Sequence, residues 1–440
     1  MSTLKVNKLR DTSGSTDAIT LDPNGGAVLA GVTTISTARV TSGIVTNTFI
    51  VGAGVTISES GIEASGIGIT CANINGAQIG GRRNIVINGA MNVAQRATSS
   101  TSAGYQTVDR FTTSMAGTDE ACTFAQVDVA SGTTPYTEGF RKAFKVTNGN
   151  QTSGAGAADD LSVSQNIESQ NLAQSGWDYT SSSSFITLSF WVKSSVAQTF
   201  FAGIRLYGDD QREFCFSYTL TADTWTKVVK SIPGAAGLTI VNSNAIGAFI
   251  QWPQWWGTNY TSSGRSVDTW QVKNNASNYP DMTTTWYETN DATWELTGVQ
   301  LEVGSQATPF EHRTSAQNYI ECCRYYQEPI NYTKGWLPIL AGRGTGTSTV
   351  ATCINLVCNM REEPSTTGSS MGTIYAYGYN SRPNSSGGAA SIVSNYGHDP
   401  QGGNYVYFSQ NGYGGAISDD RIWNIGGYGT GSKLVLDAEL

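Results

Sequence analysis

Charge, proline and histidine are scarce in this sequence, and no long apolar run is present. Charged residues make up 14% of the chain, which also has 11 Pro and only two His. No stretch approaches the roughly 20 consecutive apolar residues of a membrane-spanning helix. The opening residues, MSTLKVNKLR, lack the apolar core of a secretion signal. The sequence therefore predicts no membrane insertion. If the protein leaves a cell, we expect it to do so without a secretion signal, for example by release on lysis.

Dense positive charge is missing as well. The net charge is −8 with a pI near 4.9, and no stripe of Lys and Arg occurs. Nucleic-acid binding needs clustered positive charge to neutralise phosphates, so we expect no nucleic-acid partner. The seven Cys are scattered and include no CxxC pair. We predict that they are buried, reduced thiols of a protein made in a reducing cytoplasm.

Sequence signatures of catalysis, nucleotide use and metal binding are also absent. Residues 83–313 contain no G-x-S-x-G nucleophile elbow, and the chain has no GK[ST] phosphate loop. Adjacent carboxylates occur at Asp159-Asp160, Asp209-Asp210 and Asp419-Asp420, but neighbours in a strand point to opposite faces. Solvated turns are the main interpretation of these pairs, and a structural Ca²⁺ site is the alternative. We predict no catalytic residue, no cofactor and no metal site, and hence no enzyme.

Glycine and aromatic side chains are abundant. The chain contains 50 Gly, 11 Trp, 20 Tyr and 14 Phe, with Ser, Thr and Asn filling much of the rest. A chain of such low charge without bulky side chains would stay disordered, whereas these aromatic residues can build a core. β-Branched and aromatic residues joined by Gly-rich turns are typical of antiparallel sheets. We therefore predict an all-β, multidomain protein.

Residues 1–82 form the first region, in which charge nearly disappears after a turn signal at residues 22–26. Short glycine-led β units follow at Gly31–Ile35, Gly54–Ile57 and Gly66–Thr70. One copy of such a segment buries little apolar surface and leaves its sheet edges open. Three copies wound about one axis would bring the Ile and Val side chains together. The prediction is an intertwined trimeric β stem, with a flexible Gly/Ser/Thr linker as the alternative.

Residues 83–313 form the second region, which has the pattern of an antiparallel β-sandwich. Apolar side chains occupy every second position between Phe185 and Lys193, and the same alternation returns in Phe214–Leu220. Strict alternation of this kind indicates a half-buried strand. We predict a jelly-roll sandwich for the whole region.

The last strand of this second region changes phase. Trp294 and Leu296 share one face by alternation, whereas Val299 and Leu301 would share the other. Gly298 lies at the switch. A β-bulge adds one residue to a strand, so a bulge at this glycine would return all four side chains to one inward face.

Residues 314–440 form the third region, which opens with a helix signal. Thr314 and Gln317 have the spacing of a capping box, apolar residues at helical spacing follow, and Pro329 is expected to end the helix. Short strands and Gly-rich turns then return, and residues 374–428 are dense in Tyr, Gly, Asn and Ser. Such a composition is typical of binding surfaces that combine rigid rings with adaptable polar groups. We predict one short helix followed by a C-terminal β-rich tip domain.

Three closely spaced indoles are the first candidates for ligand binding. They are Trp252, Trp255 and Trp256, next to Pro253 and Gly257. Sugar rings have C–H faces that pack on aromatic planes, so exposed indoles would suit a glycan. The alternative is packing in the core or against another subunit.

Aromatic residues of the third region are the other candidates for glycan binding. They are Tyr375, Tyr377, Tyr379, Tyr396, Tyr405, Tyr407, Tyr413 and Trp423, together with His398 in a turn-rich segment. Tyr375, Tyr377 and Tyr379 share one strand face by alternation. An inward tyrosine face would be core, whereas an exposed face would be a platform for saccharide, and both readings stay open.

Several segments resemble appendage proteins of bacteriophages. The opening MSTLKVNKLRDTSGSTDAITLDPNGGAV is similar to the N-terminus of virion structural and tail-fibre proteins of marine phages, especially those of cyanobacteria. Residues 82–96, RRNIVINGAMNVAQR, resemble the start of a module common in phage fibres. Val108–Phe111, Ser189–Lys193 and Gly298–Glu311 resemble later elements of that module, and Cys323–Tyr326 resembles the helix that often follows it.

The resemblance implies a fold, a location and a set of partners. The middle module is similar to galactose-binding-like jelly rolls, the fold of many carbohydrate-binding modules. The protein is then expected in the virion as a homotrimeric tail appendage, made in the host bacterial cytoplasm. Its N-terminal region would attach to the phage tail or an adaptor protein, and host surface polysaccharide would be the ligand. The alternatives are a glycan-cleaving tail appendage and a purely structural connector or decoration protein.

Overall fold

The structure of the chain is a computed structural model. It describes the side chains of residues 82–329, 341, 355–365 and 435–440, and elsewhere only the backbone of the strands named below. The chain divides into two compact units, residues 1–71 and 72–440. The predicted domain boundaries at residues 82 and 313 stay predictions.

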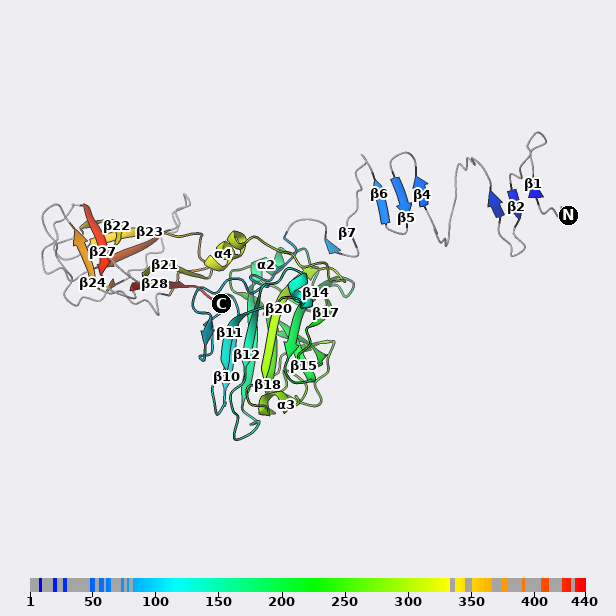
Figure 1. Cartoon of the computed structure of the whole chain (residues 1–440), viewed down its shortest axis with the longest axis horizontal. Helices are drawn as coiled ribbons and strands as arrows, with labels where there is room; N and C mark the ends of the chain where they lie inside the picture. The colour runs from blue at the N-terminus through cyan, green and yellow to red at the C-terminus, as the bar shows by residue number, and fades with distance from the viewer. Residues whose placement is uncertain are drawn as a thin grey trace. The chain divides into compact units, whose positions relative to one another are not determined.

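The central body is a sandwich of two antiparallel sheets, each with six strands (Figure 1). In order across the first sheet, the strands are β10 (Thr112–Ala116), β13 (Asp160–Glu168), β18 (Ile246–Trp256), β15 (Gln198–Leu206), β16 (Arg212–Leu220) and β19 (Trp270–Val272). In order across the second sheet, they are β17 (Thr226–Pro233), β14 (Phe185–Ser194), β20 (Thr293–Val303), β12 (Lys142–Thr147), β11 (Thr123–Asp128) and β9 (Ser99–Ser100). The chain crosses repeatedly between the layers, as in jelly rolls, and the predicted all-β class is confirmed.

The helices of the described residues are short. They are α1 (Thr134–Thr137), α2 (Ser169–Ala173), α3 (Thr285–Glu288) and α4 (Ser315–Cys323). The predicted capping box of α4 is confirmed, because the Gln317 N–H donates to the Thr314 hydroxyl at 3.2 Å and the Thr314 N–H donates to the Gln317 side chain at 2.9 Å. In these described parts, no helix has the length and apolar character needed to span a membrane.

The helix α4 ends well before Pro329, so the predicted end of this helix is wrong. Residues Tyr326–Tyr332 instead form β21, which pairs with β28 (Ser432–Asp437) more than a hundred residues later in the chain. Pairing with so distant a partner overrides the local helical spacing.

The apolar side chains of the two facing sheets form one continuous core. The four inward side chains predicted in β14 have no exposed surface: Ile186, Leu188, Phe190 and Val192. On the opposite face of this strand, Trp191 is also only 7% exposed, because it packs with Phe140 and Val129 from the connection that covers the sheet. The strand is therefore buried on both faces and not half-buried as predicted.

The strand β20 contains the bulge predicted at Gly298. Its register against β14 shifts between Ser189 and Trp191, opposite this glycine. The backbone of Gly298 has φ of +64°, which is the left-handed conformation of a bulge glycine. As a result, Trp294, Leu296, Val299 and Leu301 all point into the core with no exposed surface.

Most described cysteines are buried and none forms a disulfide. Cys122, Cys215, Cys322 and Cys323 are buried, and Cys358 is partly buried. Burial raises the pKa of Cys122 to about 11 and that of Cys323 to about 12, so their reactive thiolates are rare at neutral pH. The side chains of the remaining two, Cys71 and Cys353, lie outside the described residues.

The segments at residues 82–96 and 298–311 lie against each other. The Asn84 side chain donates to the Val299 carbonyl at 3.0 Å and accepts the Leu301 N–H at 3.1 Å. The Glu311 carboxylate accepts the backbone N–H groups of Arg83 and Asn84 at 3.3 and 2.8 Å. The two motifs therefore form one hydrogen-bonded junction at the start of the sandwich.

Asp109, in the segment Val108–Phe111, is a buried carboxylate with a pH-dependent effect on stability. Its oxygens accept the backbone N–H and the side-chain amide of Gln95 at 2.8 and 2.5 Å. Burial raises the pKa of Asp109 from 3.8 to about 6, although the Gln95 bonds and Arg96 oppose the change. The folded state thus binds the proton more tightly than the unfolded state, and stability falls as pH rises from about 4 to about 6.

The substitution Asp109→Asn should remove this pH dependence. The stability advantage of the wild type over the variant should decrease by roughly 2–3 kcal/mol between about pH 4 and pH 7. Urea unfolding followed by tryptophan fluorescence measures the difference at each pH. In Glu168, burial raises the pKa, but bonds from Arg324 and Tyr325 lower it overall. The control Glu168→Gln should therefore show the opposite sign, and a difference for Asp109→Asn that does not change with pH would contradict the assignment.

The N-terminal strands are short antiparallel pairs and meanders. They are β1 (Lys8–Leu9), β2 (Ile19–Leu21), β3 (Ala27–Leu29), β4 (Thr48–Val51), β5 (Val55–Ser58), β6 (Gly61–Ala64), β7 (Asn73–Ile74) and β8 (Ala77–Gln78). The predicted β unit at Gly54–Ile57 overlaps β5, while those at Gly31–Ile35 and Gly66–Thr70 lie outside the described residues. The trimeric winding of the stem stays a prediction.

The C-terminal strands also form antiparallel sheets. A six-stranded sheet has the order β24 (Thr373–Tyr377), β27 (Ile422–Tyr428), β22 (Leu337–Gly344), β23 (Val350–Asn355), β26 (Tyr405–Gln410) and β25 (Ala390–Ser391). The pair β21 and β28 forms a separate two-stranded sheet. The C-terminal region is therefore β-rich, as predicted.

Candidate functional site

The structure separates the three clustered tryptophans. Trp252 has no exposed surface and lies in the core between the sheets. Trp255 is 5% exposed and stacks on Tyr287 with ring centroids 5.5 Å apart. Trp256 is partly exposed and contacts Tyr279 edge to face at 5.4 Å. Core packing, the alternative left open by the sequence, holds for Trp252 and Trp255, whose rings are closed to a ligand.

A bulge in β18 explains this arrangement. In the pairing with β13, Leu161 faces Trp255 and Ser162 faces Pro253, so that Gln254 has no partner. The extra residue returns Trp255 to the core side, where Trp252 already lies. Simple alternation would have placed the two on opposite faces.

The remaining predicted glycan-binding residues lie where side chains are not described. Tyr375 and Tyr377 belong to β24, Tyr405 and Tyr407 to β26, and Trp423 to β27. Tyr379, Tyr396, His398 and Tyr413 lie outside the described residues. Their part in binding stays a prediction.

The outer face of the first sheet carries a polar cluster that the sequence did not single out. In the hairpin of β15 and β16, Arg205 and Glu213 lie directly opposite each other. Their sequence neighbours Ile204 and Phe214 point into the core, so both charged side chains point outward. Strand β18 adds Gln251 to the same face.

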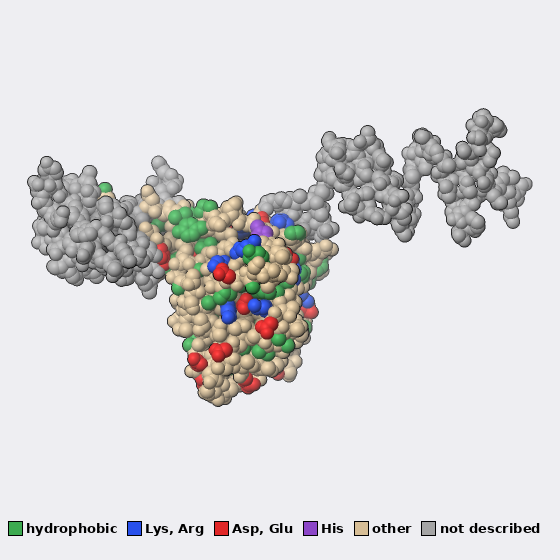
Figure 2. Space-filling view, in the orientation of Figure 1, with side chains coloured by type: hydrophobic (Ala, Val, Ile, Leu, Met, Phe, Trp, Pro, Cys, Tyr) green, Lys and Arg blue, Asp and Glu red, His purple; other side chains and the backbone are tan. Residues whose placement is uncertain are grey.

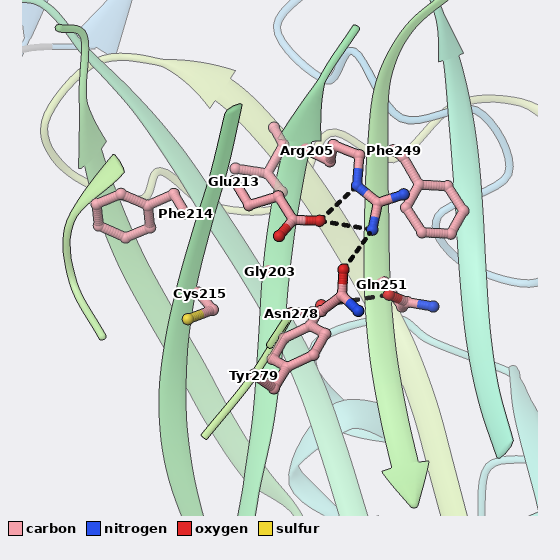
Figure 3. Close-up of a pocket in the computed structure, with 10 residues that line it drawn as sticks. Gly203, Arg205, Glu213, Phe214, Cys215, Phe249, Gln251, Asn278 and Tyr279 are labelled. Atoms are coloured by element: carbon pink, nitrogen blue, oxygen red, sulfur yellow. Dashed lines mark hydrogen bonds and ion pairs between the residues drawn. The ribbon is translucent and has the colours of Figure 1, made fainter. Parts of the chain in front are cut away.

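The charged side chains of this cluster form hydrogen bonds with one another and with Asn278 (Figure 3). The Arg205 Nε donates to Glu213 Oε1 at 2.6 Å, and an Arg265 Nη2 donates to Glu213 Oε2 at 3.0 Å. Arg205 Nη2 also donates to Asn278 Oδ1 at 3.3 Å. Burial lowers the pKa of Arg205, but the neighbouring Glu213 raises it overall, so the guanidinium stays charged.

Neutral hydrogen-bonding groups continue the cluster along the sheet. The Tyr279 hydroxyl donates to Gln251 Oε1 at 3.4 Å, and Gln251 Nε2 donates to Ser162 Oγ at 3.0 Å. Gly203 makes room for this tyrosine, because a Cβ on it would lie 2.9 Å from the Tyr279 hydroxyl and 3.0 Å from the Phe214 carbonyl. Burial raises the pKa of Tyr279 well above its usual value, so the hydroxyl remains a donor.

Arg205, Glu213, Gln251, Asn278 and Tyr279 line a small pocket whose volume of about 10 Å³ is enough for roughly one water-sized group. Binding pockets for drug-sized molecules are larger, roughly 300–1,000 Å³. Phe249 forms part of the wall and is partly exposed, with the Arg205 guanidinium 5.4 Å from its ring centre. The pocket therefore suits one polar group of a larger ligand that lies across the surface.

The pocket lacks the arrangement of a glycan-cleaving site. Glycosidases use two carboxyl groups roughly 5–9.5 Å apart. Among the described lining residues Glu213 is the single carboxylate, and both of its oxygens are bonded to arginines. Asp159 and Asp160 bond to different partners, the Tyr287 hydroxyl and the Ser114 hydroxyl. Among the described residues, no three His, Cys, Asp or Glu side chains are grouped to hold a metal ion.

Among known proteins, solved structures alone match the chain. No protein-family model and no curated protein matches the chain. Among solved structures, a tailspike protein 4 domain of bacteriophage CBA120 is 14% identical, with a TM-score of 0.27 over 50% of this chain and 21% of that one. A putative sugar-binding protein of Bacteroides thetaiotaomicron is 11% identical, with a TM-score of 0.27 over 50% of this chain and 99% of that one.

A third similar structure is the N-terminal cellulose-binding domain of a Cellulomonas fimi β-1,4-glucanase. It is 13% identical, with a TM-score of 0.23 over 49% of this chain and 99% of that one. This chain therefore spans about a fifth of the tailspike chain and nearly all of the two smaller proteins.

Proposed function

We propose that the jelly roll binds carbohydrate on the outer face of its first sheet, as part of a bacteriophage tail appendage that attaches to a bacterial host. The observation that carries this proposal is the pocket around Arg205, Glu213 and Asn278, beside the partly exposed ring of Phe249. Sugar hydroxyls pair with such fixed donors and acceptors, and a sugar C–H face packs on an aromatic ring. On the face of the molecule shown in Figure 2, acidic and basic side chains are intermixed and form no stripe of one sign.

The phage context is supported by the resembling segments and by their contacts. Asn84 and Glu311, from the opening and closing motifs, hold the two ends of the module together. A homotrimer would present three small pockets, so that weak single contacts combine into firm attachment. Light scattering of the full-length protein across dilutions tests the trimer, and a monomer at every dilution contradicts it.

The substitution Phe249→Ala tests the binding site directly. We expect a roughly tenfold weaker affinity for host surface polysaccharide, or about 1.4 kcal/mol, because the ring that packs on the sugar is lost. Titration calorimetry of the full-length protein with purified polysaccharide measures the affinity. The matched control is Trp225→Ala, a partly exposed ring that packs over the other sheet. Equal affinities of both variants and the wild type would place the glycan elsewhere.

Two other classes of function remain testable on the same protein. A glycan-cleaving appendage would release reducing sugar from host envelope. We do not expect this release, because the described residues of the pocket include a single carboxylate, Glu213, and both of its oxygens are paired with arginines. A purely structural connector would fail to decorate host cells when fluorescently labelled. Decoration that is lost in Phe249→Ala and blocked by excess polysaccharide supports attachment.

A further inference from the structure

The chain leaves the central body and returns to it beside the point of departure. Strand β21 pairs with β28 in a register that places Tyr326 opposite Asp437 and Tyr332 opposite Ser432. Paired residues of neighbouring strands lie about 5 Å apart. Residues 333–431 are therefore inserted between two strand ends that touch, and the residues after β28 lie back against the jelly roll.

The returning segment supplies carboxylates to two arginines of the jelly roll. Arg110, whose side chain is 1% exposed, forms an ion pair with Glu439. Arg96 Nη2 lies 2.9 Å from Asp437 Oδ2, and its Nη1 lies 3.3 Å from Glu439 Oε1. The Arg110 guanidinium also stacks 3.4 Å over the Tyr325 ring. Removing a partner from a buried ion pair is strongly unfavourable, so Arg110 depends on Glu439.

The backbone of the segment is bound as closely as its charges. The Ala438 N–H donates to the Tyr325 carbonyl at 2.7 Å. The Leu440 carbonyl accepts from Asn166 Nδ2 at 2.8 Å and from the Tyr105 hydroxyl at 3.2 Å. The Leu440 side chain packs on a small apolar cluster, made by Ile87, Val93, Cys322 and Tyr325. The body of the protein thus contacts the carboxylates, the backbone and the apolar Leu440 side chain of this segment.

We propose that the jelly roll carries a binding site for a short acidic peptide, and that residues 437–440 of its own chain occupy it. Arg96, Tyr105, Arg110 and Asn166 of the jelly roll receive the side chains and the end of the segment, and Arg361, outside the jelly roll, donates to the Ala438 and Glu439 carbonyls at 2.7 and 2.9 Å. The inserted residues 333–431 are then fastened to the body at both ends. Truncation after Tyr326 would leave Arg96 and Arg110 without these carboxylates, so the inserted region is better studied by internal replacement than by truncation.

Hydrogen exchange of the full-length protein tests the site. Glu439→Gln keeps the shape of the side chain and removes its charge, so amide exchange in residues 435–440 should become at least tenfold faster. Exchange in the core strand β14 should not change. The matched control Asp128→Asn alters a carboxylate that is 82% exposed and paired with Lys142 at the surface, and exchange in residues 435–440 should then stay slow. Unchanged exchange in Glu439→Gln would overturn the proposal.

A second variant frees the site without altering the residues that receive the peptide. Ala438→Pro removes the N–H that bonds to Tyr325. A labelled synthetic peptide of residues 433–440 should bind full-length Ala438→Pro at least tenfold more tightly than wild type, as measured by fluorescence anisotropy. The same peptide with Gln at position 439 should bind at least tenfold more weakly. Equal binding of both peptides, or no binding to the variant, would show that no acidic-peptide site exists.

Discussion

Replacing Trp252 by Ala should lower the free energy of unfolding by about 3–5 kcal/mol, because removal of a fully buried large aromatic side chain leaves a cavity. The Trp252 ring has no exposed surface and contacts Phe111 and Phe190, with ring centroids 6.4 and 5.6 Å apart. These contacts join the first sheet to the second at the middle of the core. Urea unfolding of wild type and variant, followed by circular dichroism, measures the loss.

Trp256→Ala is the matched control for Trp252→Ala. Its ring is partly exposed on the outer face and packs with Tyr260 and Tyr279. We expect this variant to lose less than half as much stability as Trp252→Ala, because the cost of truncation grows with the apolar area that is buried. Equal losses, or a stable Trp252→Ala protein that has lost only glycan binding, would contradict the assignment of Trp252 to the core.

The sequence predicted those features that depend on neighbours in the chain. Alternation in residues 185–193 identified the inward face of β14, and the phase change at Gly298 located a bulge. The capping box of α4 depends on two residues three positions apart, so it was also visible. In each case the signal and the structure lie within one element.

Features that depend on pairing between distant segments could not be predicted in the same way. The register of β15 with β16 brings Arg205 and Glu213 opposite each other, and no pattern within either strand indicates that pairing. Asn278 lines the pocket and Arg265 bonds to Glu213, both from the irregular segments on either side of β19, whose paths have no periodic signal. The predicted end of α4 was wrong for a similar reason, because β21, the strand that follows this helix, pairs with the distant β28.

The tryptophan cluster shows how one inserted residue changes a functional interpretation. Trp252 and Trp255 are three positions apart, so alternation exposes one of them if the strand is regular. The unpaired Gln254 returns Trp255 to the core, and the glycan-binding interpretation of both rings is lost. The candidate site instead lies on the outward side chains of the same strand, next to Phe249.

Gly298→Ala should destabilise the jelly roll by about 2–5 kcal/mol, for two separable reasons. Its φ of +64° costs a residue with a Cβ roughly 1–2 kcal/mol, and crowding of a packed core costs about 1–3 kcal/mol more. The crowding arises because a Cβ here would lie 2.7 Å from the Phe140 ring. Gly132→Ala is the control, since φ is +84° there and a Cβ would meet nothing within 4 Å. In urea unfolding the control should show the conformational cost alone, and equal losses in both variants would mean that Phe140 moves aside and the bulge tolerates a side chain.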